Sequence, residues 1–353
     1  MKNVLLTGAL LLGSLAALAQ NILTVDNNPL TAAQYTDLQA AVDAASPGDF
    51  IYIYPSETQY ATTLTLDKEV HLRGVSHFPG QVNAIGDLNL VDDPTSPDDA
   101  SNASVSGLWI NRIRTLSGTQ NNIRIANCRL AVVGEISPSG PPQGNGWIIE
   151  GCVLINASGP LAPISAPGGL NWVIHHNIIQ RTTNSALIQN LSSTALVFNN
   201  LFIMDFATMV NNAPNVHFQN CMFWYTGNSG TFFYTASSGV SFTNCLTYAP
   251  VAGSFAALPG SNNLDNVNPL FVSVSSAAPQ FSYSHDYRLA PGSPAIGAGT
   301  NGDDIGIYDG NYDFLQRGYA ADLPYVRDFI ILNPAISIGS GDSLRVGFEA
   351  IGN

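Results

Sequence analysis

Glu150 and His175 are the side chains whose types and spacing best fit acid–base chemistry. They lie 25 residues apart, and each stands directly before the turn position of a short repeated pattern. If successive repeats stack, the carboxylate and the imidazole project outward from neighbouring coils within hydrogen-bond reach, as a general acid and base require. The plainer interpretation, which we favour, is a solvated row of surface side chains.

Arg181 and Asp205 form a second pair of catalytic candidates. They follow the turn positions of neighbouring repeats by five and six residues, so stacking would bring them together. An exposed ion pair is the favoured interpretation, and such a pair adds little stability.

An acidic cluster lies near the end of the repeat region, at Asp303, Asp304, Asp309 and Asp313. Carboxylate oxygens of this kind are ligands for calcium. The spacing does not match an EF-hand loop, and aspartates in turns commonly accept hydrogen bonds from nearby backbone. We therefore expect no cofactor, with calcium at these four aspartates as the alternative.

Four aromatic residues are candidates for carbohydrate binding. Trp147 and Trp172 each stand two residues before an aligned apolar position, and Trp224 and Tyr225 follow a later turn. An exposed row of such rings would contact the apolar faces of sugars. The tryptophans share the inward parity of the core positions, however, and this favours packing in the core.

These candidates are positioned by a repeat of about 24 residues. Six segments share an apolar residue, a turn residue in the third column and a small residue in the fourth: I-A-N-C-R-L from Ile125, I-E-G-C-V-L from Ile149, I-H-H-N-I-I from Ile174, V-F-N-N-L-F from Val197, F-Q-N-C-M-F from Phe218 and F-T-N-C-L-T from Phe242. The fourth column comprises Cys128, Cys152, Asn177, Asn200, Cys221 and Cys245, at spacings of 24, 25, 23, 21 and 24 residues. Such regularity predicts stacked coils, with like residues in ladders along the axis.

The third column predicts a left-handed turn in every coil. It contains only Asn, Gly and His, which tolerate positive φ better than most residues: Asn127, Gly151, His176, Asn199, Asn220 and Asn244. The four cysteines would form buried free thiols in the ladder, with the bonds Cys128–Cys152 and Cys221–Cys245 as the alternative. A straight ladder does not suit a tetrahedral zinc site.

The two ends of the chain differ from the repeats. Residues 1–19 have the charge, apolar run and Ala17-Leu18-Ala19 of a signal peptide, which predicts secretion. We expect a strand and a helical cap over 20–49, the helix beginning with a capping box from Thr36 to Gln39. The β-helix would occupy 50–315, and 316–353 would form a β extension with a hairpin between 335–338 and 344–348.

Three stretches resemble the pectate-lyase-like superfamily of secreted proteins: L-Q-A-A-V-D-A-A-S-P-G-D from Leu38, N-P-L-F from Asn268, and L-A-P-G-S-P-A-I-G-A-G from Leu289 with the following D-I-G. With the coil pattern, the resemblance covers most of residues 22–310. It implies an all-β fold, a right-handed single-stranded parallel β-helix. It does not imply an activity, since the superfamily holds lyases, hydrolases, esterases, epimerases and adhesins.

Composition and missing motifs limit the function. The net charge of −13 argues against nucleic acid as a partner, and no later stretch is long enough for a transmembrane segment. The chain lacks the combined N-T-D, G-H-G and R-I-K motifs of polygalacturonase-like enzymes, and W-x-D-H and R-x-P-x-x-R as well. We expect a non-catalytic extracellular scaffold that binds polysaccharide or builds a surface or matrix assembly. The alternatives are a polysaccharide lyase or glycoside hydrolase and an end-to-end filament subunit.

Overall fold

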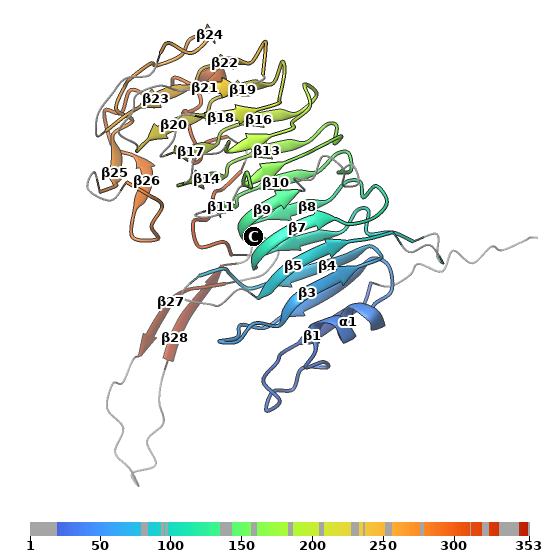
Figure 1. Ribbon diagram of the computed structural model, residues 1–353. Coiled ribbons are helices and arrows are strands. Elements are labelled where there is room, and N and C mark those ends of the chain that lie inside the picture. The colour runs from blue at the N-terminus through green and yellow to red at the C-terminus, as the bar shows by residue number, and fades with distance from the viewer. Residues whose placement is uncertain are drawn as a thin grey trace, which may run out of the picture.

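The computed structural model is a parallel β-solenoid in which the coils stack along one axis (Figure 1). It describes residues 20–351 apart from 79–83, 93–94, 96–97, 135–142, 157–160, 183–185, 205–207, 227–232, 236, 251–255, 276–278, 311, 320–324 and 332–345. The predicted signal peptide and Asp205 lie outside this range.

One face of the solenoid is an 11-stranded sheet, here called sheet A. Its strands, in spatial order, are β1 (Ile22–Val25), β2 (Asp49–Ile53), β4 (Val70–Gly74), β6 (Ser104–Ser106), β8 (Arg124–Ala126), β10 (Ile148–Glu150), β13 (Val173–His175), β16 (Leu196–Phe198), β19 (His217–Gln219), β22 (Ser241–Thr243) and β24 (Gly260–Ser261). Every pairing is parallel, and the aligned apolar residues Ile125, Ile149 and Ile174 are direct partners.

The second face, sheet B, begins after the left-handed turn. Its main run is β3 (Ala61–Leu66), β5 (Ile85–Leu90), β7 (Trp109–Thr115), β9 (Arg129–Gly134), β11 (Val153–Asn156), β14 (Ile178–Arg181), β17 (Leu201–Met204), β20 (Met222–Tyr225) and β23 (Leu246–Tyr248). The end of β9 also pairs with β12 (Ile164–Ser165), which leads on to β15 (Ile188–Gln189), β18 (Thr208–Asn211) and β21 (Phe233–Thr235). The later coils therefore have three faces.

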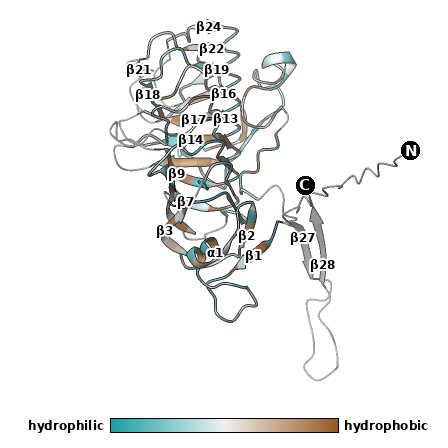
Figure 2. Ribbon diagram, turned by 90° about the vertical axis from the view of Figure 1, so that its right-hand side faces the viewer, coloured by the Kyte–Doolittle hydropathy of each residue, from teal (hydrophilic) through white to brown (hydrophobic). Residues whose placement is uncertain are grey.

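The inward side chains of all faces form one continuous apolar core. Helix α1 (Leu38–Ala44) lies beside β1 and β3 at the start of the stack, where Leu38, Ala41 and Val42 are fully buried (Figure 2). Its N-cap is Asp37, which accepts a hydrogen bond from the Ala40 N–H. The cap is thus one residue later than the capping box predicts, and Gln39 instead accepts a hydrogen bond from Thr65 N–H.

The turn column has the backbone conformation that its residue types predict. The six residues have φ between 50° and 61°. Beside it, all four cysteines are buried free thiols. The Cys128 N–H points to Cys152 Sγ at 3.4 Å, and the Asn177 N–H donates to Asn200 Oδ1 at 3.0 Å, so side chains of one coil accept from the backbone of the preceding coil.

The ladder is longer than the six aligned segments. Asn262 has φ 58°, and Asn263 accepts a hydrogen bond from the Cys245 N–H, so S-N-N-L from Ser261 makes a further coil. Its strand, β24, has only two residues, too few for the apolar pattern to be recognised.

The outer face of the later strands of sheet B is covered by the chain that follows the last coil. Residues 264–298, the outer layer, include the antiparallel pair β25 (Phe271–Ser273) and β26 (Asp286–Leu289). Their apolar side chains form a second core against outward residues of β11, β14, β17 and β20. The 3-10 turn η1 (Thr300–Gly302) follows. Strands β27 (Tyr325–Ile331) and β28 (Val346–Ile351) pair antiparallel, and the predicted segment 335–338 lies outside the described residues.

Candidate functional site

Glu150, His175 and Phe198 lie side by side on the outer surface of sheet A. They end strands β10, β13 and β16 and are direct partners in the parallel register. The same row continues to Gln219, and we call these four residues the outer row. Because parallel strands place like positions above one another, the His175 ring stacks on Phe198 with centroids 4.9 Å apart and planes 2° apart.

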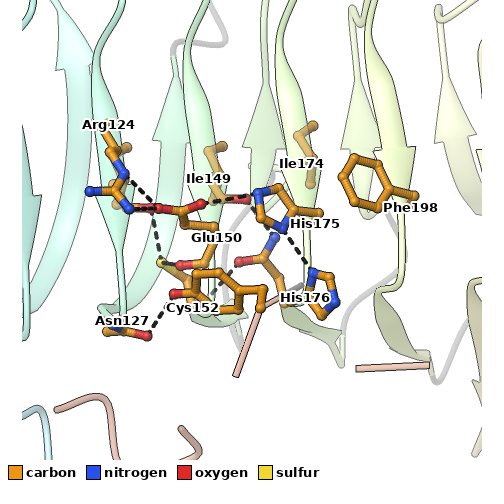
Figure 3. Close-up of polar contacts among 12 residues, drawn as sticks. Arg124, Asn127, Ile149, Glu150, Cys152, Ile174, His175, His176 and Phe198 are labelled. Carbon is orange, nitrogen blue, oxygen red and sulfur yellow. Dashed lines mark hydrogen bonds and ion pairs between the residues drawn. The ribbon is translucent and has the colours of Figure 1, made fainter. Parts of the chain in front are cut away.

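Both carboxylate oxygens of Glu150 are engaged (Figure 3). Oε1 accepts from Arg124 Nε at 2.6 Å, and Oε2 lies 3.0 Å from His175 Nε2. Only 8% of the side chain is exposed. Burial alone would raise the pKa of Glu150, but the hydrogen bond from His175 and the charge of Arg124 outweigh it and lower the pKa. Glu150 is therefore an ionised, fully paired carboxylate.

A chain of hydrogen bonds fixes the protons on the two histidines. His176 Nε2 lies 2.6 Å from the carbonyl oxygen of Asp309, which only accepts, so Nε2 carries the hydrogen. Burial lowers the pKa of His176 to about 4, which leaves Nδ1 as an acceptor. The Nδ1 atoms of His175 and His176 are 2.8 Å apart, so His175 donates there and also, from Nε2, to Glu150. His175 therefore bridges Glu150 and His176 through its two ring nitrogens.

The turn column is covered by a segment from the far end of the chain. Residues 299–318, the return segment, run back across successive coils. The contacts that join it to the column include Thr300 N–H to Asn220 Oδ1 (3.0 Å), Asn199 Nδ2 to the Gly306 carbonyl (2.9 Å), His176 to the Asp309 carbonyl, and Tyr312 Oη to Asn127 Oδ1 (2.9 Å). The column therefore forms the turns and also binds the return segment.

Gly151 is the one glycine among the six aligned turn positions, and Tyr312 explains it. A Cβ atom at Gly151 would lie 2.2 Å from Tyr312 Oη and 2.5 Å from Asn127 Oδ1. The position thus requires both a positive φ and the absence of a side chain. Burial, with the nearby Cys152 and Glu150, raises the pKa of Tyr312, so its hydroxyl stays protonated and donates to Asn127.

A groove of about 440 Å³ lies between the outer row and the return segment. Thr300, Asp303, Gly310 and Tyr312 form its wall on the return-segment side. The Glu150–His175 pair lies at one end, and the neutral side chains of Phe198, Asn199 and Gln219 continue the floor. Glu150 and His175 are engaged with each other, so the groove offers a ring edge, amides, hydroxyls and the Asp303 carboxylate.

Arg181 does not join this site. It ends β14 on sheet B, where its side chain is 2% exposed and burial lowers its pKa. Arg181 is therefore buried where we expected an exposed side chain, and it lies on a different sheet from Glu150. Asp205 lies outside the described residues.

The aromatic candidates are buried. Trp147 and Trp172 stack with centroids 4.8 Å apart, and each Nε1 donates to a backbone carbonyl of a neighbouring coil. Tyr225 lies in the same core, and Trp224 stacks on Phe271 of the outer layer at 5.0 Å. None of them presents a face to a sugar, which corrects the carbohydrate-binding alternative for these four residues.

The acidic cluster organises turns. Asp304 Oδ1 accepts from the Gly297 N–H, and Asp309 accepts from the N–H groups of Asp304 and Gly310. Asp303 lines the groove, while Asp313 is exposed. Among the described residues, no three His, Cys, Asp or Glu side chains gather into a group that would hold a metal ion.

Comparison with known proteins gives the chain no family. No family model matches the chain, and no curated protein matches it in sequence at a significant level. Within the described part of the chain, no helix has the length and apolar character needed to cross a membrane.

The column alignment contained a signal for one residue that sequence reasoning missed. Phe198 occupies the position before the turn, as Glu150 and His175 do. The same alignment therefore predicts that the Phe198 ring lies beside His175. Tyr312 and Asp309 gave no such signal, since they come from a segment without the repeat.

Proposed function

We propose that this protein is a secreted, non-catalytic scaffold that binds carbohydrate in the groove beside the outer row. We further propose that the solenoid is a right-handed β-helix of the pectate-lyase-like type, on the strength of the opening and closing motifs. The observation that carries the non-catalytic assignment is the double engagement of Glu150 by Arg124 and His175.

The charge state of Glu150 supports this proposal. A general acid for glycoside hydrolysis needs a carboxyl group with a raised pKa beside the leaving oxygen. The pKa of Glu150 is lowered, and each of its oxygens already holds a donor. His175 is likewise engaged at both nitrogens, so it offers no lone pair to a substrate proton.

The surface around the groove supports a sugar ligand. Phe198 is half-buried and Leu196, two residues earlier on the same face of β16, is 58% exposed. Apolar surface of this kind packs against the C–H face of a sugar ring. The Gln219 amide, whose Nε2 donates to Thr300 Oγ1, lies beside it, and such a polar group fixes the orientation of a ligand in a largely apolar site.

A panel of polysaccharides tests both parts of the proposal. The mature chain is expected to be retarded in native gels containing one or more neutral polysaccharides, and to release neither reducing ends nor unsaturated uronates, with or without calcium. Release of either product would favour the lyase or hydrolase alternative and overturn the scaffold.

Two matched variants locate the binding surface. Leu196→Ser removes exposed apolar surface beside Phe198, whereas Leu170→Ser removes it at a coil turn outside the groove, where Leu170 is 45% exposed. We expect the first to weaken retardation and the second to leave it unchanged. Equal retardation of all three proteins would remove the groove as the binding site. Recovery of the protein from the medium tests secretion.

A further inference from the structure

A pocket of about 220 Å³ lies where three parts of the chain meet. Outward side chains of β17 and β20 line it on the side of sheet B, and the β25–β26 pair of the outer layer lines a second side. Residues 304–308 of the return segment line a third side. The pocket shares no lining residue with the groove beside the outer row, so the two sites are independent.

Two aromatic rings of the outer layer line this pocket, and a stacked neighbour holds each of them in place. Phe271 stacks on Trp224 with centroids 5.0 Å apart, and Tyr287 stacks on Phe281 with centroids 6.1 Å apart. The rings of Phe271 and Tyr287 meet almost at right angles, with 83° between their planes. Aromatic rings prefer edge-to-face and offset contacts with one another. The pocket therefore offers pre-formed partners to a further planar ring.

Buried apolar side chains complete most of the lining. Leu201, Met222 and Ile307 are almost fully excluded from water. A Cβ atom at Gly306 would lie 3.1 Å from the Met222 methyl carbon, so the missing side chain leaves room for the flexible thioether. An apolar cavity of about 150 Å³ is large enough to hold benzene. This pocket therefore has room for one ring with a small substituent.

Two polar side chains at the pocket have unused capacity for hydrogen bonds. The Tyr308 hydroxyl bonds to no described residue, and partial burial raises its pKa to about 12, so it stays protonated and can donate. Asp304 accepts from the Gly297 N–H through Oδ1, while its Oδ2 accepts from no described donor. Arg288, which also lines the pocket, is paired with Asp286 at 2.5 Å. The lining thus presents one donor and one acceptor beside the apolar surface.

We propose that this pocket binds a small phenol, an uncharged aromatic ring that carries one hydroxyl group. The ring packs among Phe271, Tyr287 and Met222. Its hydroxyl group donates to Asp304 Oδ2 and accepts from the Tyr308 hydroxyl, which satisfies both free groups. A sugar of similar size fits poorly, because most of its hydroxyl groups would lose water and meet apolar side chains.

Calorimetric titration of the mature chain with 4-methylphenol, toluene and methyl glucoside tests the ligand class. We expect 4-methylphenol to bind and toluene to bind about tenfold more weakly, since toluene leaves Asp304 and Tyr308 without a partner. Methyl glucoside should not compete with 4-methylphenol. Equal affinity for 4-methylphenol and toluene would show an unspecific apolar cavity and overturn the phenol assignment. Absence of 4-methylphenol binding, or its displacement by methyl glucoside, would overturn it as well.

Three variants test the assigned contacts. Tyr308→Phe removes only the hydroxyl group, and it should weaken 4-methylphenol binding about five- to tenfold while leaving toluene binding unchanged. Tyr54→Phe is the matched control, because Tyr54 is an exposed tyrosine outside the pocket, and it should bind as the wild type does.

Asp304→Asn keeps Oδ1 for the Gly297 N–H but replaces the accepting Oδ2 with an amide donor, so it should also weaken 4-methylphenol binding several-fold. Unchanged affinity in Tyr308→Phe would refute the contacts of the hydroxyl group. The comparison of ligands on the wild type decides the ligand class even if Asp304→Asn does not fold.

Discussion

His77 offers a direct test of how burial and charge act in this protein. The ring follows β4 and is 1% exposed, with Nδ1 2.8 Å from the hydroxyl of Tyr283. Its Nε2 atom is buried without a hydrogen-bond partner in the described structure. Burial, and then the charge of Arg129, lower the pKa of His77 to about 3 from an ordinary value of 6.5.

The sign follows from linkage. The folded pKa is depressed, so the unfolded chain takes up a proton on His77 below about pH 6.5 while the folded chain does not. The contribution of neutral His77 to the free energy of unfolding is fully present above that pH. It is lost progressively as the pH falls from 6.5 to about 3. Each unit of pH in this window costs about 1.4 kcal/mol, which gives about 2 kcal/mol at pH 5.

Urea unfolding of the wild type and His77→Asn at pH 8 and pH 5 measures this contribution. Asparagine keeps a polar atom for Tyr283 but does not titrate. The substitution changes the free energy of unfolding at pH 8, so we compare how far each protein falls from pH 8 to pH 5. The free energy of unfolding of the variant should fall by about 2 kcal/mol less than that of the wild type. His176 titrates in both proteins, so its share cancels. An equal fall in both proteins would refute the reasoning.

Three further outcomes follow from the contacts around the turn column. Gly151→Ala should lower the free energy of unfolding by about 2–3 kcal/mol, because its Cβ meets Tyr312 and the backbone has positive φ; combining it with Tyr312→Ala should recover part of that loss in the same melt. Glu150→Gln should cost about 2–4 kcal/mol at pH 7, since Arg124 loses its anion and His175 loses a carboxylate acceptor; a change below 0.5 kcal/mol in urea titration would contradict the pairing. The four thiols should resist Ellman's reagent in the folded protein and react in full in urea, since burial raises the pKa of Cys152 and Cys245; reductant should leave the melting temperature unchanged.

The parts of the fold that depend on local spacing were predictable. The recurrence of Asn, Gly or His beside a small residue predicts where each coil turns, because few residues tolerate a left-handed backbone. It also places Glu150 beside His175, since their separation is one coil. A two-residue strand such as β24 carries too little pattern to be found this way.

Contacts between distant segments were not predictable in the same way. The partners of His176 and Asn127 are Asp309 and Tyr312, which lie more than one hundred residues later and belong to no repeat. The outer layer likewise explains why Trp224 is buried: parity along β20 places the ring outward, and Phe271 covers it there. The repeat pattern indicates which side of the sheet a residue faces. It does not indicate which distant segment packs against that side.

The return segment has a consequence for how the molecule folds. In a plain stack each coil contacts only its neighbours, so coils melt from the ends and stability is nearly a sum of local terms. Here a hydrogen bond joins Ser76 to the backbone of Arg317 across 241 residues, and others bind the coils between them to the same segment. Loss of any intermediate coil therefore removes support from the whole span. This favours a single cooperative transition, reached only after the last coil has been synthesised.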